Sequence, residues 1–381
     1  MERTLFEPEH DLFRESFRKF LDQHVAPNHA KWEEAGIVDR DVWLEAGKQG
    51  FLGMAVPEEC GGGGVVDFRY NAVLTEEVTR GQFSGLGFTL HNDVIAPYLV
   101  DLTNDEQKQR WLPGFCSGEI ITAIAMTEPG TGSDLQGIKT RAVRDGDDWI
   151  INGAKTFITN GINADIVIVV AQTDPDKGAM GFSLFVVERG MAGFERGRNL
   201  DKLGLKAQDT AELSFADVRV PGKNLLGTEG MGFIHLMQNL PQERLSIAVM
   251  AAGAMEGCLD TTIQYVRDRK AFGKPIGALQ NTRFVLAELA TKTTAVRIMV
   301  DRFIEDLNAG KLSAEDAAKA KWWSTEEQLD LINRCLQLHG GYGYMKEYPI
   351  AKAYMDARIQ TIYGGTTEIM KEIIGRSLKL S

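Results

Sequence analysis

An acidic residue beside a long apolar run is the first candidate for chemistry in this chain. Glu243 lies in the stretch 239–244, just before the almost uncharged run 245–255. A carboxylate that faces an apolar interior is costly to keep ionised, so its pKa should rise toward the range of a general base. The same stretch also has a purely structural interpretation, because Pro241 followed by an acid is typical of a helix start. A base at Glu243 is therefore a hypothesis that needs support from elsewhere in the chain.

Four loops have compositions that suit ligand binding. Residues 126–134 are small and polar, so their backbone N–H groups can approach an anion, and 155–160 put an aromatic ring beside two hydroxyls. Residues 269–274 combine cations with an aromatic ring, and the glycine-rich stretch 338–344 lets the backbone come close to a ligand. Each loop taken alone is more often a structural turn than a site. The motifs HExxH, Walker A and a GxGxxG framed by strand and helix are missing, which argues against zinc hydrolysis, P-loop chemistry and a Rossmann cofactor.

Composition restricts the classes of function. The 381 residues, 44% hydrophobic and 25% charged, are typical of a soluble globular protein of two or three domains. A net charge of −11 argues against a nucleic-acid partner. The four cysteines are far apart, which favours reduced thiols over disulfides or a metal site. The acidic N-terminus does not resemble a targeting peptide and no apolar run could span a membrane, so we predict a cytoplasmic location.

The elements that must position these residues fall into three predicted domains. Helical spacing dominates residues 1–119, and short β-rich runs separated by turn pairs such as Asp145-Gly146 and Asn152-Gly153 fill residues 120–229. No helix separates the strands, so this sheet should be antiparallel, a barrel or sandwich. Residues 230–381 contain long helices joined by short loops, with the first helix interrupted at Pro241, which predicts a four-helix bundle. The predicted fold class is α+β.

Motifs along nearly the whole chain resemble those of the acyl-CoA dehydrogenase family. The family's signatures correspond here to 125–129 with Ser133-Asp134, and to 337–343 with 362–366, in the same order. The resemblance implies a helical domain, a β-barrel and a four-helix bundle, in agreement with the periodicity of the sequence.

One departure from the family pattern concerns the catalytic base. Most members carry a glutamate immediately after the tyrosine of the last motif, where this chain has Gly364. In the branch that resembles long-chain acyl-CoA dehydrogenases the base lies in a Leu-Pro-Gln-Glu-Arg motif, present here at 240–244. The resemblance thus implies that Glu243 is the base.

The resemblance further implies FAD-dependent α,β-dehydrogenation of an acyl-CoA thioester that is long-chain or branched. Glu243 would remove the Cα proton while hydride leaves Cβ for the flavin, and the backbone N–H of Gly364 would stabilise charge on the thioester oxygen. The implied FAD contacts are Met126, Thr127, Gly132, Ser133, Phe157, Ile158, Thr159, Thr366 and Glu368, with Arg269, Phe272, Gln337 and Gly341 from a neighbouring subunit. The implied substrate contacts are Ser133, Arg244, Tyr363, Gly364 and Arg376, and no metal is expected.

The implied partners are electron-transfer flavoprotein, as electron acceptor, and further copies of the chain in a homotetramer built as a dimer of dimers. Two alternatives stay open: an oxygen-using acyl-CoA oxidase or flavin monooxygenase, and a catalytically silent subunit. The small residues Ala248, Ala251, Ala252 and Gly253 are compatible with room for an acyl tail and equally with close helix packing.

Overall fold

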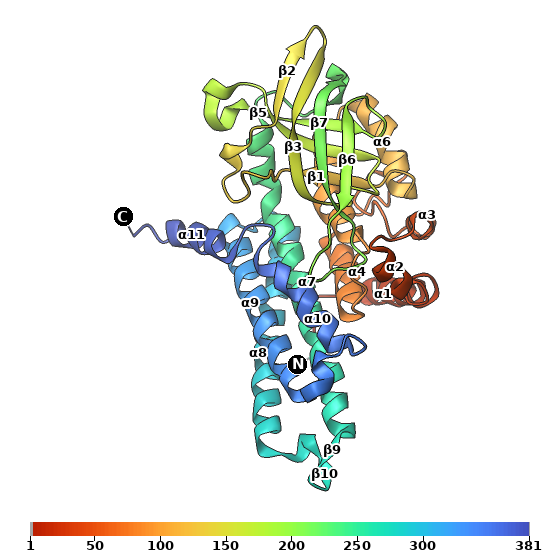
Figure 1. Cartoon of the computed structure of the whole chain (residues 1–381), viewed down its shortest axis with the longest axis vertical. Helices are drawn as coiled ribbons and strands as arrows, with labels where there is room; N and C mark the ends of the chain where they lie inside the picture. Colours follow the sequence, from red (N-terminus) through yellow and green to blue (C-terminus); the bar gives the residue numbers. More distant parts are fainter. Residues whose placement is uncertain (1–2, 381) are drawn as a thin grey trace.

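The computed structural model describes residues 3–380 and has the three-part organisation expected from the sequence (Figure 1). The β-domain lies at one end of the molecule, and three long helices run from it toward a small hairpin at the other end (Figure 1). The predicted fold class is confirmed. Among the residues between 3 and 380, no helix has the length and apolar character needed to cross a membrane.

The N-terminal part is helical because its sequence combines capping residues at the helix ends with apolar residues along one face of the helices. The Asp67 side chain accepts a hydrogen bond from the Arg69 amide and starts helix α4, and Asn104 and Gln107 cap the start of α6 reciprocally. Gly118, with φ +80°, ends α6. The helices are α1 (Pro8–Phe20) with a π-helical turn (Leu21–Val25), α2 (His29–Ala35), α3 (Arg40–Lys48), α4 (Phe68–Arg80), a second π-helical turn (Leu90–Ile95), α5 (Ala96–Asp101) and α6 (Asp105–Ser117).

The central part is one sheet, in which burial largely alternates along β7 and is almost continuous along β4 and β5. Its strands are β1 (Thr122–Ala125), β2 (Arg141–Asp145), β3 (Asp148–Thr159), β4 (Ile166–Gln172), β5 (Phe182–Glu188), β6 (Phe194–Asn199), β7 (Thr210–Val220) and β8 (Leu225–Leu226), in the order β6-β7-β3-β2-β4-β5-β8. Most neighbours are antiparallel, as predicted. The prediction is wrong for β1, which pairs with β4 in parallel, and for the single bridge between β2 and β4. The β2–β3 hairpin separates β1 from β4 in the chain, so β1 and β4 can pair in parallel without a crossover helix.

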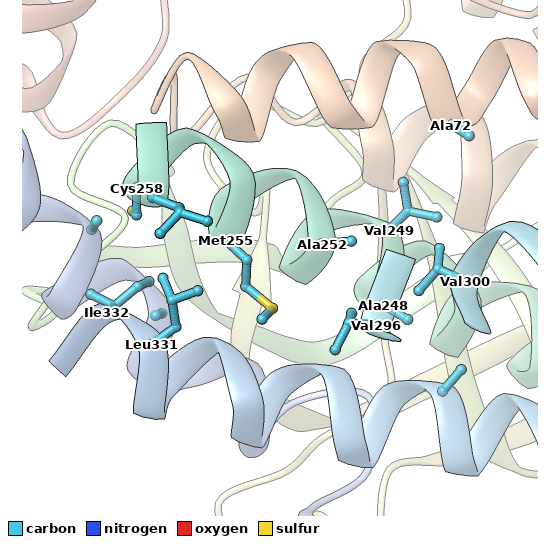
Figure 2. Close-up of a cluster of buried hydrophobic side chains, with 14 of the residues drawn as sticks. Ala72, Ala248, Val249, Ala252, Met255, Cys258, Val296, Val300, Leu331 and Ile332 are labelled. Carbon is cyan, nitrogen blue, oxygen red and sulfur yellow. The ribbon is translucent and has the colours of Figure 1, made fainter. Parts of the chain in front are cut away.

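The C-terminal part consists of α7 (Gly232–Asp268), α8 (Gln280–Asn308), α9 (Ala314–His339), α10 (Pro349–Ala357) and α11 (Thr367–Ser377), with the β9–β10 hairpin (Lys270–Ala271 and Lys274–Pro275) at the far end. The prediction of an interruption at Pro241 is wrong, because α7 continues through it. Figure 2 shows the core where α4, α7, α8 and α9 meet, with Ala252 and Met255 of α7 between Val296 of α8 and Ile332 of α9.

Helix α4 lies close against α7 because two glycines of α7 face it. A Cβ on Gly253 would come within 2.5 Å of Thr79 Oγ1 and 3.1 Å of the Glu76 Cα. The small residues of α7 therefore serve helix packing at Ala248, Ala252 and Gly253, and none of them lines the large cavity described below.

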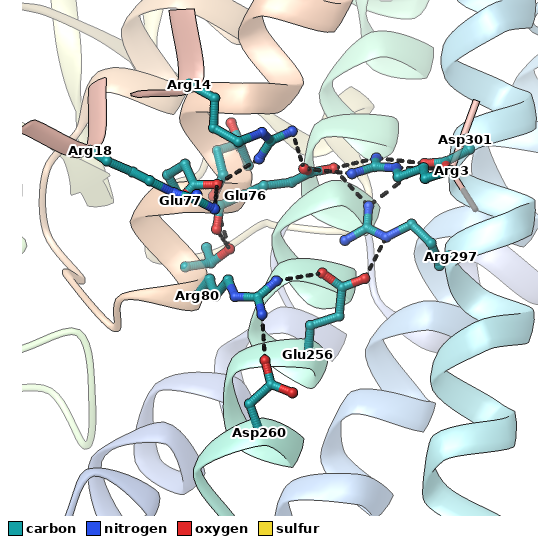
Figure 3. Close-up of polar contacts among 12 residues, drawn as sticks. Arg3, Arg14, Arg18, Glu76, Glu77, Arg80, Glu256, Asp260, Arg297 and Asp301 are labelled. Atoms are coloured by element: carbon teal, nitrogen blue, oxygen red, sulfur yellow. Dashed lines mark hydrogen bonds and ion pairs between the residues drawn. The ribbon is translucent and has the colours of Figure 1, made fainter. Parts of the chain in front are cut away.

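Buried ion pairs hold α4 in this position (Figure 3). The Glu76 carboxylate, 3% exposed, accepts from Arg3, Arg14 and Arg297, and thereby joins the N-terminal segment, α1 and α8. Arg297 also donates to Glu256 of α7 at 2.8 Å. Such a network fixes the relative positions of the helices, because removing one member leaves buried charge without a partner.

Candidate active site

A cavity of about 770 Å³ lies where the three parts of the chain meet. Its wall includes the loop after β1, one face of α7 and the turn before α11. The predicted site residues that line it are Met126, Thr127, Gly132, Ser133, Thr159, Glu243, Arg244, Tyr363, Gly364 and Arg376. One cavity therefore collects residues from four separate motifs.

Glu243 lies in the cavity wall in a site with few polar partners. Its side chain is 7% exposed, and Oε1 accepts a hydrogen bond of 3.0 Å from the Tyr98 hydroxyl of α5. Burial raises the pKa of Glu243 to about 7, although the hydrogen bond from Tyr98 and the charge of Arg244 both act to lower it. The carboxyl is thus poised between its two protonation states near neutral pH, as a general base requires.

Two partners of this region have no motif in the sequence. Tyr98 is 145 residues from Glu243, and nothing in its local sequence indicates the hydrogen bond. Asp93, in the π-helical turn Leu90–Ile95, accepts hydrogen bonds from Asn71 at 2.7 Å and from Ser246, one turn beyond Glu243. Burial raises the pKa of Asp93 to about 6. A π-helical turn is frequent near functional sites, but this turn is seen only in the structure, so the sequence held no signal for Asp93.

Gly364 is held in a conformation that disfavours a side chain. Its φ is +63°, in the left-handed region, and a Cβ there would overlap the Cδ1 of Ile247. Ile247 lies one turn after Glu243 on α7 and lines the same cavity. The backbone of the turn is anchored by two cations, since Arg244 Nε donates to the Gly364 carbonyl at 3.5 Å and Lys321 Nζ to the Gly365 carbonyl at 2.6 Å.

A buried ion pair organises the loop 126–134. The Lys155 ammonium is fully buried and donates to the Met126 carbonyl and to Glu128 Oε1, each at 2.9 Å. Glu128 in turn accepts from the amides of Lys139 and Thr140. The loop is thereby fixed at its first residues, while the backbone around Gly132 and Ser133 is exposed.

The end of β3 contains a bulge that turns one aromatic side chain outward. The register of β3 and β7 shifts between Lys155 and Ile158, and Phe157 has φ +59° with its side chain 68% exposed. A non-glycine residue in this region of φ is uncommon and often marks a functional site. Ile158 points the other way and is buried in the core of the sheet, so its side chain does not reach the cavity.

The remaining predicted residues are not brought to the cavity. Arg269, Gln337 and Gly341 line a separate hollow of about 490 Å³ at the other end of the bundle, and Phe272 on the β9–β10 hairpin is 90% exposed. Thr366 caps the start of α11 through its hydroxyl, and Glu368 lies on the surface in the first turn of that helix. These two residues lie near the turn at Gly364 but outside the lining of the cavity.

Comparison with known proteins gives the same family for all three parts. The family models for the N-terminal, middle and C-terminal domains of acyl-CoA dehydrogenases match residues 7–119, 123–218 and 230–379. The long-chain specific acyl-CoA dehydrogenase of Mus musculus is 52% identical over 99% of this chain and 88% of its own length. The isovaleryl-CoA dehydrogenase of Oryza sativa subsp. japonica is 37% identical over 98% of this chain and 92% of its own.

A solved structure agrees with this assignment. The crystal structure of acyl-CoA dehydrogenase from Geobacillus kaustophilus is 50% identical and has a TM-score of 0.97, over 98% of this chain and 99% of that one. The family resemblance drawn from the motifs is confirmed. The chain belongs to the acyl-CoA dehydrogenase family and is an oxidoreductase.

Proposed function

We propose that this protein oxidises long-chain acyl-CoA thioesters to trans-2-enoyl-CoA in an FAD-dependent reaction, with Glu243 as the base that removes the Cα proton. The observation that carries the proposal is Glu243 itself: a buried carboxyl in the wall of a large cavity, with a pKa raised to about 7, opposite a glycine that cannot act as a base.

The residues around the cavity fit a flavin. Around Gly132 the loop is open, since a Cβ there would meet nothing closer than Thr127 Cγ2 at 3.9 Å, so the backbone can approach a ligand. Phe157 lies outside the lining of the cavity and is exposed at the end of β3, next to Thr156, whose amide donates to the Thr127 carbonyl of the same loop at 2.9 Å. Met126, Thr127, Gly132, Ser133, Phe157 and Thr159 would hold the FAD, with Ile158 contributing backbone only. When bound, FAD supplies the acceptor for hydride.

The chain's own residues would handle the proton and the charge. Glu243 would take the Cα proton in its ionised form, and the apolar surroundings that raise its pKa would also exclude water. The N–H of Gly364 would donate to the thioester oxygen and stabilise developing enolate charge. Arg244 and Lys321 support this role because they hold the carbonyls of the same turn. Ser133, Tyr363 and Arg376 would contact the substrate.

The length of the cavity supports a long acyl chain. Glu243, Ile247, Met250, Ala254 and Cys258 lie on one face of α7 and line the same cavity. With a rise of 1.5 Å per residue, this face extends roughly 22 Å beyond Glu243. An extended hydrocarbon advances roughly 1.25 Å per C–C bond of about 1.5 Å, so there is room for about 18 bonds beyond C2, which is enough for a chain of about 16 to 18 carbons. The long-chain specific relatives at 51–52% identity support the same class.

A second copy of the chain would complete the cofactor site. Arg269, Gln337 and Gly341 line a hollow separate from the cavity, and Phe272 is exposed, which supports a role of these residues toward the FAD of a neighbouring subunit in a homotetramer. Thr366 and Glu368 would contribute from the start of α11. Electron-transfer flavoprotein is the proposed acceptor. The cytoplasmic location stays a prediction, and the names of the long-chain relatives place those proteins in mitochondria.

An anaerobic titration of the FAD-loaded protein with palmitoyl-CoA tests the proposal. The flavin of the wild type should bleach, and Glu243→Gln should bleach at least a hundredfold more slowly, because it loses the proton acceptor. Asp260→Asn is the matched control, since it removes an exposed acid from the same helix outside the cavity. Equal bleaching of Glu243→Gln and wild type would contradict the role of Glu243.

A further inference from the structure

Three hydrogen bonds join α5 and the π-helical turn before it to the turn of α7 that carries Glu243. The Gln242 side chain donates from Nε2 to the Asp93 backbone carbonyl at 2.7 Å. Its neighbour Glu243 accepts from the Tyr98 hydroxyl at 3.0 Å. One turn further along α7, the Ser246 hydroxyl donates to the Asp93 carboxylate. The contact made by Gln242 is thus next in the chain to the proposed base, and the reaction as described so far does not use it.

A proline leaves the Asp93 carbonyl without its usual helical partner. The chain continues as one helix from the π-helical turn into α5. In an α-helix this carbonyl would accept from the N–H four residues later, but that residue is Pro97, which has no N–H. Asp93 is 2% exposed and therefore out of reach of bulk water, so another donor must satisfy its carbonyl. Gln242 supplies that donor from α7.

Helix α7 has a matching gap two residues before the proposed base. Pro241 cannot donate to the Met237 carbonyl, so α7 lacks one internal hydrogen bond in the turn that carries Glu243. A helix is held less firmly by its own backbone where such a bond is missing. The direction of the Glu243 side chain therefore depends on contacts with neighbouring segments, and the bond made by Gln242 is the contact adjacent to it in the chain.

Asp93 is itself held from the other side. Its carboxylate accepts from Asn71 Nδ2 of α4 at 2.7 Å, so the segment that carries Tyr98 is fixed to the N-terminal helices. Gln242 and Asp93 both lie outside the lining of the cavity. They can therefore act on a bound thioester only through a residue that lines it, which here is Glu243.

We propose that Gln242 is a positioning residue for the base: its bond to the Asp93 carbonyl holds the turn of α7 that carries Glu243. The Glu243 carboxyl thereby stays in contact with the Tyr98 hydroxyl. This inference rests on the proposed function, since it needs Glu243 to be the proton acceptor. Without the bond made by Gln242, the ionised carboxylate loses part of the hydrogen bond that favours it, so the base needs a higher pH to ionise.

The test measures the pH profile of kcat/KM for palmitoyl-CoA on the FAD-loaded enzyme with an artificial electron acceptor. Gln242→Met keeps the length of the side chain and removes the donor. Its midpoint should lie about half to one pH unit above that of wild type, so kcat/KM at pH 7 should fall about two- to fivefold and recover at high pH. Gln238→Met is the matched control: it makes the same change at an exposed glutamine one turn earlier on α7, and should keep the wild-type midpoint.

The profile separates positioning from damage to the fold. A variant that only folds poorly or loses FAD lowers kcat/KM by the same factor at every pH and leaves the midpoint in place, and this result for Gln242→Met would overturn the positioning role. If Gln242→Met yields no FAD-loaded protein, Gln242→Asn takes its place. It keeps an amide that is one methylene too short for the Asp93 carbonyl, and should shift the midpoint in the same direction.

The double variant Gln242→Met/Tyr98→Phe shows whether Gln242 acts through Tyr98. Its midpoint should coincide with that of Tyr98→Phe, because the contact that Gln242 protects is already gone. A further rise as large as in the single variant would overturn the positioning role. The proposed function is judged separately: bleaching of Glu243→Gln at the wild-type rate refutes the base itself, whereas slow bleaching of Glu243→Gln with an unchanged midpoint in Gln242→Met overturns only the role of Gln242.

Discussion

The hydrogen bond from Tyr98 to Glu243 should determine the pH at which the enzyme becomes active. Tyr98→Phe removes the donor and keeps the ring, so the carboxyl stays buried but loses a stabilising contact to its ionised form. A hydrogen bond to a charged group contributes about 1.5–3 kcal/mol. At about 1.4 kcal/mol per pKa unit, the pKa of Glu243 should rise from about 7 to roughly 8–9.

Glu243 acts as a base only in its ionised form, so a higher pKa lowers kcat/KM at neutral pH. At pH 7 the ionised fraction of Glu243 should fall from about a half to between roughly a tenth and a hundredth, so kcat/KM should fall about 5- to 50-fold. The loss should disappear above about pH 10, roughly one unit above the shifted pKa, where the carboxyl is almost fully ionised. The measurement is the pH profile of kcat/KM for palmitoyl-CoA with an artificial electron acceptor, for wild type and Tyr98→Phe.

Tyr363→Phe is the control for the loss of a hydroxyl from the same cavity. The Tyr363 hydroxyl donates to Gln360 Oε1 at 3.1 Å and not to Glu243, so this variant should keep the wild-type midpoint whatever happens to its rate. A midpoint that does not move in Tyr98→Phe would refute the reasoning, because the hydrogen bond would then contribute nothing to the ionisation of the base.

Three further substitutions test the packing around the site. Gly364→Ala should lower the free energy of unfolding by about 2–4 kcal/mol in urea denaturation, because of backbone strain and overlap with Ile247. Adding Ile247→Val should restore part of this free energy, and no restoration would argue against the overlap. Ala254→Phe should block the cavity roughly 16 Å beyond Glu243 and lower the ratio of kcat/KM for palmitoyl-CoA to that for octanoyl-CoA at least tenfold; an unchanged ratio would mean that the tail lies elsewhere. Glu76→Gln should reduce the free energy of unfolding at pH 7 by about 3–5 kcal/mol. Because the pKa of Glu76 is lowered to about 2 in the folded state, from an ordinary value near 4.5, this difference should shrink as pH falls from 4.5 toward 2 and be absent at lower pH.

Local signals predicted much of the fold. The bounds of α4 and α9 coincide with local signals, because the side chains of Asp67 and Ser313 cap the starts of these helices and glycines follow their ends. Two expectations failed for non-local reasons. Pro241 does not break α7, since packing along the helix outweighs the hydrogen bond that proline cannot donate. The parallel pairing of β1 with β4 depends on the order of the strands in the sheet, which strand periodicity does not encode.

Part of the candidate site could likewise be predicted from local sequence, and part depends on tertiary packing. Glu243 and the loop 126–134 lie in contiguous motifs, so the sequence was sufficient to propose them. Tyr98 and Asp93 reach the site only through the packing of the N-terminal helices on α7, and their own segments carry no motif. The sequence indicated Gly364 as a missing glutamate, but only the structure gives the steric reason, because Ile247 fills the space that a side chain would need.

The contact between Gly364 and Ile247 has an evolutionary consequence. Moving the base from α7 back to the turn before α11 would need a glutamate at 364 and a smaller residue at 247 in the same protein. A glutamate alone would collide with Ile247, and a smaller residue at 247 alone would open a void beside the reacting carbons. We therefore expect the effects of substitutions at 364 and 247 to be non-additive, because a side chain at 364 and the Cδ1 of Ile247 would occupy the same space.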